Sequence, residues 1–332
     1  MSFTVRIEET GQSFEVGPGE TVLNAGMRQS VTLPHECTLG GCGTCRVRVL
    51  QGKVEYDEFP FGLTEAEAAE GYALVCQARP CSDLQISAPA PAPAHSEPGR
   101  HAAEVLELRQ VSQDVCILEL ELPLELAANL VYQPGQHLNV HLGDGKTRSF
   151  SMARASAATG VELHIRQIPG GRFTQQQLPQ LRAGDTLEIE LPLGGFHYHA
   201  RDERPVLMLA TGTGIAPLRS ILESLLDSDD CPPISLYWGM REPAELYLHN
   251  ELESWRDRLY EFNYVPVLSR PGPEWNGRRG YVQQAACEDL ADLSGYGIYL
   301  CGSPAMIAEA KAALLDRGAD PEHIYVDGFS FQ

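Results

Sequence analysis

Four cysteines constrain the first part of this chain more than any other feature. Cys37, Cys42 and Cys45 stand within the stretch CTLGGCGTC, and Cys76 follows thirty residues later. Structural zinc sites usually combine two short Cys-x2–4-Cys pairs, but Cys76 stands alone at the end of the apolar run YALVC. A disulfide framework is disfavoured as well, because the chain has an odd number of cysteines, nine, and MSFTVRIEETG shows no export signal.

The spacing of these cysteines is instead typical of plant-type 2Fe–2S clusters, in which gaps of four and two residues precede a distant fourth ligand. We therefore predict that the metal ligands are Cys37, Cys42, Cys45 and Cys76. Three glycines would let the loop curl around the cluster and let N–H groups approach its sulfides: Gly40, Gly41 and Gly43. A zinc loop or a group of free buried thiols remains the alternative. Four further cysteines are predicted to be packing residues: Cys81, Cys116, Cys231 and Cys287.

The alternating Pro and Ala of residues 88–94 predict an extended, semi-rigid linker. We divide the chain into a first domain at 1–87, a linker at 88–99, a second domain at 100–201 and a third at 202–332. The first domain has alternating runs at 4–8, 13–16 and 46–49, a helical pattern at 22–27 and a buried run at 72–76. With a capping box at Thr64 and Glu67, these patterns predict a small sheet crossed by a helix.

The two later domains have different rhythms. Short strand-like runs at 105–111, 115–122, 137–141, 161–167 and 186–191 are separated by Gly, Pro or Asp, which predicts an antiparallel barrel or sandwich. The apolar run 205–210 then leads through a glycine-rich turn into a helix that should end near Leu226, and another strand is expected at 234–238. Continued alternation of strands and helices predicts a parallel α/β sheet, so the fold class is multidomain α+β and α/β.

The overall charge excludes some partners. The chain carries 25 basic and 45 acidic residues, a net charge of −20, and such a surface repels nucleic acid. The acidic surface serves solubility, or steers a basic protein partner. No run approaches the roughly 18 apolar residues of a membrane span, so we expect no membrane partner and a cytoplasmic location.

Three later motifs carry the chemistry of the second and third domains. Arg-Ser-Phe-Ser occupies 148–151, Gly-Gly-Arg-Phe-Thr occupies 170–174, and Gly-Thr-Gly-Ile-Ala-Pro occupies 212–217. On these motifs and the cysteine spacing, residues 1–87 resemble a plant-type ferredoxin with a β-grasp fold. The rest resembles the ferredoxin–NADP+ reductase superfamily, with an antiparallel β-barrel FAD domain and a Rossmann-like parallel α/β NAD(P) domain. This order resembles the single-chain reductase components of bacterial Rieske-type aromatic-ring dioxygenases, and RSFSMA, LHIRQIPGGRF and GDTLEIELPLG are most similar to terephthalate dioxygenase reductases.

The resemblance implies a set of flavin contacts. Arg148 would face a phosphate of FAD, Phe150 would cover the isoalloxazine ring in place of the family's tyrosine, and Ser151 would lie near N5 as a catalytic residue. The remaining flavin-binding residues implied are Ser149, His164, Ile165, Arg166, Gly171, Arg172, Phe173 and Thr174, which would surround the ribityl chain and the pyrophosphate.

The resemblance also implies the nicotinamide contacts. Gly212, Thr213 and Gly214 would hold the pyrophosphate of NADH or NADPH at a helix start, and Arg241 would lie beside the adenosine half. Cys301 would lie against the nicotinamide as a second catalytic residue that assists geometry without forming a covalent bond. Phe329 is the candidate aromatic near the flavin.

The implied function is electron transfer. NAD(P)H would give a hydride to FAD, and the electrons would then pass singly to the 2Fe–2S cluster and on to an oxygenase component or its ferredoxin. The same chain serving a diiron monooxygenase or a deoxysugar dehydrase remains an alternative. A free-flavin reductase and a redox-sensing module that never turns over are others.

Overall fold

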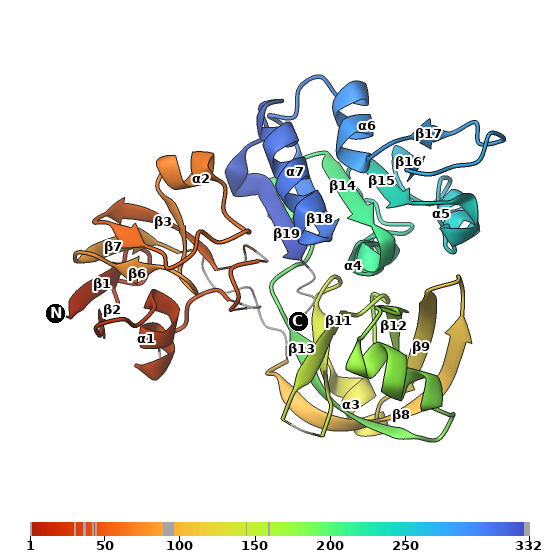
Figure 1. Cartoon of the computed structure of the whole chain (residues 1–332), viewed down its shortest axis with the longest axis horizontal. Coiled ribbons are helices and arrows are strands. Elements are labelled where there is room, and N and C mark those ends of the chain that lie inside the picture. Colours follow the sequence, from red (N-terminus) through yellow and green to blue (C-terminus); the bar gives the residue numbers. More distant parts are fainter. Residues whose placement is uncertain are drawn as a thin grey trace.

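The chain folds around three main sheets, which lie at the left, the lower right and the upper right of Figure 1. The computed structural model describes residues 2–29, 31–35, 38–41, 43, 45–88, 96–143, 145–158 and 160–328. The red and orange part contains the first sheet, the yellow and green part the second, and the green and blue part the third. The predicted combination of a β-grasp domain, an antiparallel barrel and a parallel α/β domain is confirmed.

The first sheet has the order β2-β1-β7-β3-β5. Its strands are β1 (Phe3–Ile7), β2 (Ser13–Val16), β3 (Arg46–Gln51), β5 (Tyr72–Leu74) and β7 (Leu84–Ser87), and only β1 and β7 run parallel. A two-stranded ribbon joins β4 (Val54–Glu55) to β6 (Arg79–Pro80), and the helices are α1 (Val22–Arg28) and α2 (Glu65–Ala69). The predicted capping box of α2 is present, with Thr64 and Glu67 bonded in both directions.

The predicted strand at 72–76 is shorter than expected. It ends at Leu74, because the N–H groups of Gln77 and Ala78 turn back to bond the Leu74 carbonyl oxygen. Cys76 therefore stands in a tight turn after the strand and not within it, and the turn directs this residue toward Cys45 at the start of β3.

The second sheet is antiparallel throughout, in the order β11-β10-β13-β8-β9-β12. Its strands are β8 (Gly99–Gln110), β9 (Val115–Glu121), β10 (His137–His141), β11 (Thr147–Ser151), β12 (Val161–Arg166) and β13 (Thr186–Leu193), with α3 (Leu124–Asn129) between β9 and β10. An antiparallel bridge between Met152 and Leu163 joins the two edge strands and closes the barrel. β8 begins earlier than the predicted residue 105.

The third sheet is parallel, in the order β17-β16-β15-β14-β18-β19. Its strands are β14 (Val206–Thr211), β15 (Ile234–Met240), β16 (Phe262–Leu268), β17 (Arg278–Arg279), β18 (Gly297–Gly302) and β19 (Ile324–Gly328). The helices α4 (Ile215–Ser224), α5 (His249–Ser254), α6 (Val282–Asp289) and α7 (Pro304–Leu315) connect them. β14 and β18 are buried along nearly their whole length, which explains their continuous apolar sequences.

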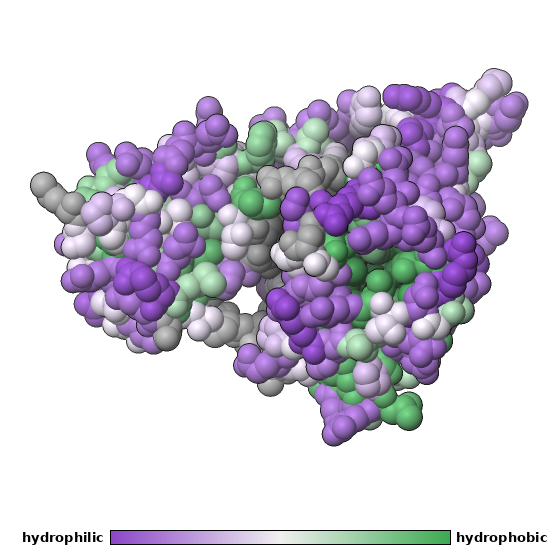
Figure 2. Space-filling model, turned by 60° about the horizontal axis from the view of Figure 1, so that its bottom comes forward, coloured by the Kyte–Doolittle hydropathy of each residue, from purple (hydrophilic) through white to green (hydrophobic). Residues whose placement is uncertain are grey.

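The surface agrees with the acidic composition. Hydrophilic residues cover most of the face shown in Figure 2, and hydrophobic residues line a hollow in its right half and reach the surface at a few other places. None of the helices in the described part of the chain is long and apolar enough to cross a bilayer.

Candidate functional site

A large cleft lies where the barrel, the parallel sheet and the cysteine-rich segment meet. Its volume is about 1160 Å³, and its walls come from the barrel, from the parallel sheet and, through His35 and Leu39, from the cysteine-rich segment. Most of the predicted site residues line it, namely Arg148, Ser149, Phe150, Ser151, His164, Arg166, Gly171, Arg172, Phe173, Thr174, Gly212, Thr213 and Arg241. Residues far apart in the sequence are thus brought to one cavity of the size that large cofactors need.

Some predicted site residues lie elsewhere. Ile165 is fully buried in the barrel core, and Cys301 is fully buried in β18. Gly214 packs against β18, because a Cβ atom there would lie 2.3 Å from the Cys301 carbonyl oxygen. Its small size lets the helix start pack on the strand. Phe329, Cys37 and Cys42 lie outside the described residues.

The β11 wall presents the Arg-Ser-Phe-Ser motif. The Arg148 guanidinium lines the cleft and donates to the Thr147 carbonyl oxygen at 2.8 Å. The Phe150 ring leans on Phe173, with the centroids 5.5 Å apart. A cation and an aromatic ring held in this way suit a ligand that carries both a phosphate and a flat ring system.

The Gly-Gly-Arg-Phe-Thr segment forms a tight turn that opens a short π-helical segment, Arg172–Gln177. Gly170 has a φ of +79°, and a Cβ atom on Gly171 would lie 2.3 Å from the Thr174 hydroxyl oxygen. That hydroxyl accepts the N–H of Ile168 at 3.2 Å. Glycine is thus required for the tightness of this turn, and the turn lines the cleft at the start of a helical segment, which fits a group with phosphate oxygens.

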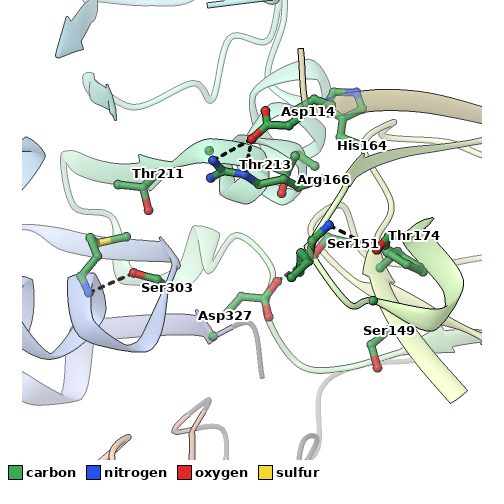
Figure 3. Close-up of a pocket in the computed structure, with 18 of the residues that line it drawn as sticks. Asp114, Ser149, Ser151, His164, Arg166, Thr174, Thr211, Thr213, Ser303 and Asp327 are labelled. Carbon is green, nitrogen blue, oxygen red and sulfur yellow. Dashed lines mark hydrogen bonds and ion pairs between the residues drawn. The ribbon is translucent and has the colours of Figure 1, made fainter. Parts of the chain in front are cut away.

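Two arginines from different domains share the Asp114 carboxylate in the cleft, and Figure 3 labels Asp114 and one of the two, Arg166. The Asp114 Oδ2 atom lies 2.8 Å from Arg166 Nη2 and 2.9 Å from Arg241 Nη2. Glu245 forms a second ion pair with Arg241. Asp114 lies between β8 and β9, and sequence reasoning missed it because nothing in the surrounding VSQDV marks it as a partner of an arginine 127 residues away.

A second carboxylate bridges the barrel and the parallel sheet. In Figure 3, Asp327 at the end of β19 points toward Ser151, whose hydroxyl donates to Asp327 Oδ2 at 2.9 Å. The same oxygen lies 3.8 Å from Cys301 Sγ. Burial and the nearby Asp327 charge raise the pKa of the Cys301 thiol well above its ordinary value, so this thiol stays protonated. Sequence reasoning missed Asp327 as well.

His164 belongs to a buried network behind the cleft wall. Its Nε2 atom lies 2.8 Å from Glu162 Oε1, and its Nδ1 atom lies 3.1 Å from the Tyr247 hydroxyl. Since a carboxylate only accepts, Nε2 carries the proton and Nδ1 accepts from Tyr247. Arg219 of α4 pairs with Glu251 at 2.7 Å and lies 3.7 Å from Glu162. This network ties the barrel to the helices of the parallel-sheet domain.

The protonation of this network gives a pH prediction. Burial lowers the pKa of His164 in spite of Glu162, while hydrogen bonding to His164 and the charge of Arg219 outweigh burial and lower the pKa of Glu162 to about 2. When the pH drops below about 6.5, His164 takes up a proton in the unfolded chain but not yet in the folded chain. The free energy of unfolding therefore decreases as the pH is lowered. We expect the urea concentration at the midpoint of unfolding to decrease as the pH is lowered from about 7.5 to about 5.5. The decrease should be less steep in His164→Gln.

The matched control for that measurement is His101→Gln. His101 lies on β8, which β9 separates from β12 and the network. Equal slopes for His164→Gln and the unmodified protein would contradict the assignment of a neutral buried imidazole.

The described part of the cysteine constellation fits a metal cluster. The Cys45 and Cys76 sulfur atoms lie 3.1 Å apart, both residues are buried, and neither is in a disulfide. Two thiols at this separation are arranged as two neighbouring ligands of one metal ion. Gly40 and Gly43 have φ of +74° and +78°, as the curled loop requires, whereas Gly41 has no such strain. Cys81 is exposed, contrary to its predicted role in packing.

The side of the cleft expected to receive the nicotinamide cofactor begins at the end of β14. Gly212–Gly214 forms a single 3-10 turn that leads into α4, and Gly212 has a φ of +59°. A Cβ atom on Gly212 would lie 3.4 Å from Arg166 of the barrel, so this turn faces the flavin segment closely. Ser303 caps α7 by accepting the Met306 N–H at 3.3 Å, and Pro304 lies in the first turn of the helix.

Comparison with known families finds one family match for each of the three domains. Residues 5–81 match a 2Fe-2S iron-sulfur cluster binding domain, residues 102–198 an oxidoreductase FAD-binding domain, and residues 208–312 an oxidoreductase NAD-binding domain. The three matches follow one another in the order of the three sheets.

Several known proteins match this chain over nearly its whole length. Terephthalate 1,2-dioxygenase reductase component 1 of Comamonas sp. is 32% identical over 333 residues, which cover 99% of this chain and 98% of the relative. The CDP-6-deoxy-L-threo-D-glycero-4-hexulose-3-dehydrase reductase of Yersinia pseudotuberculosis is 32% identical over 332 residues, 99% of each chain. The crystal structure of the Amycolatopsis cytochrome P450 reductase GcoB matches with a TM-score of 0.72, 33% identity and 98% coverage of both chains. The chain therefore belongs to the family of flavin- and iron–sulfur-dependent reductases that carry electrons from NAD(P)H through FAD to a 2Fe–2S cluster within one polypeptide.

Proposed function

We propose that this reductase supplies electrons to the oxygenase component of an aromatic-ring dioxygenase, directly or through a separate ferredoxin. The observation that carries the proposal is the shared cleft, which residues of the ferredoxin segment line together with the flavin and nicotinamide motifs. The dioxygenase assignment is supported by the similarity to the terephthalate dioxygenase reductase over nearly the whole chain. A cytoplasmic location is proposed with it, because cluster thiols need a reducing compartment.

The chain's own residues bind and orient the cofactors. We propose that Arg148 and the turn at Gly171 hold the flavin phosphates, that Phe150 covers the ring system, and that the Gly212–Thr213 turn receives the dinucleotide pyrophosphate. Ser151 is proposed to lie beside the reacting edge of the flavin, held by Asp327. When bound, FAD supplies the step from two-electron hydride chemistry to one-electron transfer, which the cluster requires.

The cleft favours NADH over NADPH. Arg241, the arginine expected near the adenosine half, is already paired with Asp114 and Glu245. Together with Arg166 this group has two positive and two negative charges, so it offers no net charge to a 2′-phosphate. A 2′-phosphate next to the Glu245 carboxylate would be repelled. We therefore propose that NADH is the physiological donor.

An anaerobic titration of the purified holoprotein tests this function. NADH should bleach the flavin absorbance and produce the EPR signal of a reduced 2Fe–2S cluster in the same titration. NADPH should need at least about tenfold higher concentration for half reduction. Absence of either chromophore, or a preference for NADPH, would contradict the proposal.

A panel of acceptors tests the partner. The reduced protein should transfer electrons faster to a Rieske-type oxygenase or its ferredoxin than to a diiron hydroxylase, a cytochrome P450 or a deoxysugar dehydrase. Faster transfer to one of the other three would move this chain to that class of system. Transfer to free flavin alone would make it a flavin reductase.

A further inference from the structure

A fully buried lysine joins the parallel domain to the ferredoxin domain. Lys311 of α7 is 2% exposed, and its Nζ atom lies 2.9 Å from both carboxylate oxygens of Glu67 in α2. Figure 1 shows these two helices facing each other from different domains. Lysine is almost never fully buried without a partner, because removing an ammonium ion from water costs far more than its methylenes gain.

The Glu67 carboxylate gathers contacts from both domains. It is fully buried, accepts the backbone N–H of Thr64 at 2.7 Å and pairs with Arg46 of β3 at 2.7 Å. Burial alone would raise the pKa of Glu67, but Lys311, Thr64 and Arg46 lower it, so the carboxylate is charged. Lys311 thus completes a buried cluster that the ferredoxin domain cannot complete alone.

The same ammonium group reaches the cysteine loop through one residue. Lys311 Nζ donates to the Gly62 carbonyl oxygen at 3.0 Å, and the Gly62 N–H donates to the Gly40 carbonyl oxygen at 2.7 Å. A side chain on Gly62 would press into this loop, since its Cβ atom would lie 2.9 Å from that same oxygen. Lys311 is therefore two hydrogen bonds from the loop that carries the predicted cluster ligands.

The end of β19 touches the loop at a second point. A Cβ atom on Gly328 would lie 3.2 Å from the Gly41 carbonyl oxygen. Gly328 directly follows Asp327, which bonds Ser151 in the cleft. The docked ferredoxin domain therefore places its cysteine loop beside the flavin segment, and α7 and β19 fix that placement.

The outer contacts of this interface are weaker. The Tyr72 hydroxyl donates to Glu322 Oε1 at 2.9 Å, and Arg48 lies 3.9 Å from the same atom. The Arg48 and Glu322 side chains are more than half exposed, and exposed ion pairs contribute little to affinity. A further contact crosses the interface, because the Arg46 guanidinium also donates to the Pro321 carbonyl oxygen. Among these polar contacts, that of Lys311 is the most deeply buried.

We propose that Lys311 is a positioning residue that holds the ferredoxin domain with its cysteine loop at the flavin cleft. It thereby sets the rate of electron transfer from FAD to the cluster without affecting the reduction of FAD by NAD(P)H. The expected effect on electron transfer rests on the proposed function. The docking of the ferredoxin domain does not, because it consists of contacts within this chain.

The test uses Lys311→Met in the full-length holoprotein, which keeps the length of the side chain and removes its charge. Hydrogen exchange should rise in α2 and at Gly62–Leu63, and small-angle scattering should show a more extended molecule. In anaerobic stopped-flow, reduction of FAD by NADH should stay within about twofold, while reduction of the cluster slows by about tenfold or more.

A second variant keeps the test decisive if Lys311→Met folds poorly. Glu67→Gln retains the capping box of α2, since Gln serves there as well as Glu, but removes the charge that Lys311 needs. It should show the same two effects. The double variant Lys311→Met/Glu67→Gln removes both charges and should recover part of the docking, because no unpaired charge is left between these two residues.

Glu322→Gln in the exposed outer contact is the matched control and should behave as the unmodified protein. The proposal is overturned if Lys311→Met leaves both hydrogen exchange and cluster reduction unchanged, or if it slows FAD reduction as much as cluster reduction. An unmodified protein whose cluster is never reduced by NADH would refute the proposed function instead, and hydrogen exchange would still decide the docking.

Discussion

Replacing Cys76 with alanine is expected to abolish the 2Fe–2S cluster while leaving the flavin reducible. Cys76 and Cys45 are buried with their sulfur atoms 3.1 Å apart, so the loss of one thiol removes half of this ligand pair. The flavin motifs lie on β11, β12 and the turn after β12, which Cys76 does not support. Iron content and the EPR signal should fall to background, NADH should still bleach FAD, and transfer to an acceptor protein should be lost.

The matched control is Cys116→Ala, which removes a buried thiol from the core of the barrel. It should keep both chromophores and electron export. Undiminished export by Cys76→Ala would contradict the route through the cluster and would favour direct transfer from the flavin. A simultaneous loss of FAD and iron would indicate a folding defect. In that case Cys45→Ala, which removes the other thiol of the pair, tests the same prediction.

Replacing Ser151 with alanine is expected to slow reduction of the flavin by NADH by about a hundredfold. The Ser151 hydroxyl is nearly buried and is oriented by Asp327 at 2.9 Å, so it is a preorganised hydrogen-bonding group at the proposed reacting edge. Removing one such group from an active site typically costs 10²- to 10³-fold in rate. Anaerobic stopped-flow at the flavin absorbance measures this step apart from later electron transfer.

Two further variants frame that result. Ser156→Ala removes an exposed hydroxyl after the same strand and should leave the rate unchanged. Asp327→Asn keeps an oxygen that accepts from Ser151, so it should lie between Ser151→Ala and the unmodified protein. A normal rate in Ser151→Ala with a full complement of FAD would remove this residue from the catalytic machinery.

The parts that sequence reasoning predicted were those with local signals. The cysteine spacing, the capping box of Thr64 and Glu67, and the change from short alternating strands to longer apolar ones each depend on neighbouring residues. They identified the three kinds of sheet and the wall of the cleft on β11. The strand predicted at 72–76 was too long because the turn bonds to the Leu74 carbonyl oxygen have no apolar signature.

The parts that it missed depend on contacts between domains. Asp114 meets Arg241 across 127 residues, Asp327 meets Ser151 across 176, and Lys311 meets Glu67 across 244. Carboxylates and lysines are common surface residues, so none of these stands out in a single sequence. Gly214 was predicted to bind the cofactor because it belongs to the same motif as Gly212 and Thr213. The nearby Cys301 carbonyl oxygen gives a further reason for a glycine at this position, which is close packing.

The buried charge on α7 also limits how such chains can be recombined by engineering. A chimaera that joins a foreign ferredoxin to residues 96–328 would place a new surface over Lys311. Without a carboxylate at the position of Glu67, the lysine would remain as an unpaired charge at the junction, and the two halves would associate poorly. Exchange of the first domain therefore requires either a carboxylate at the position of Glu67 or a matching exchange of Lys311.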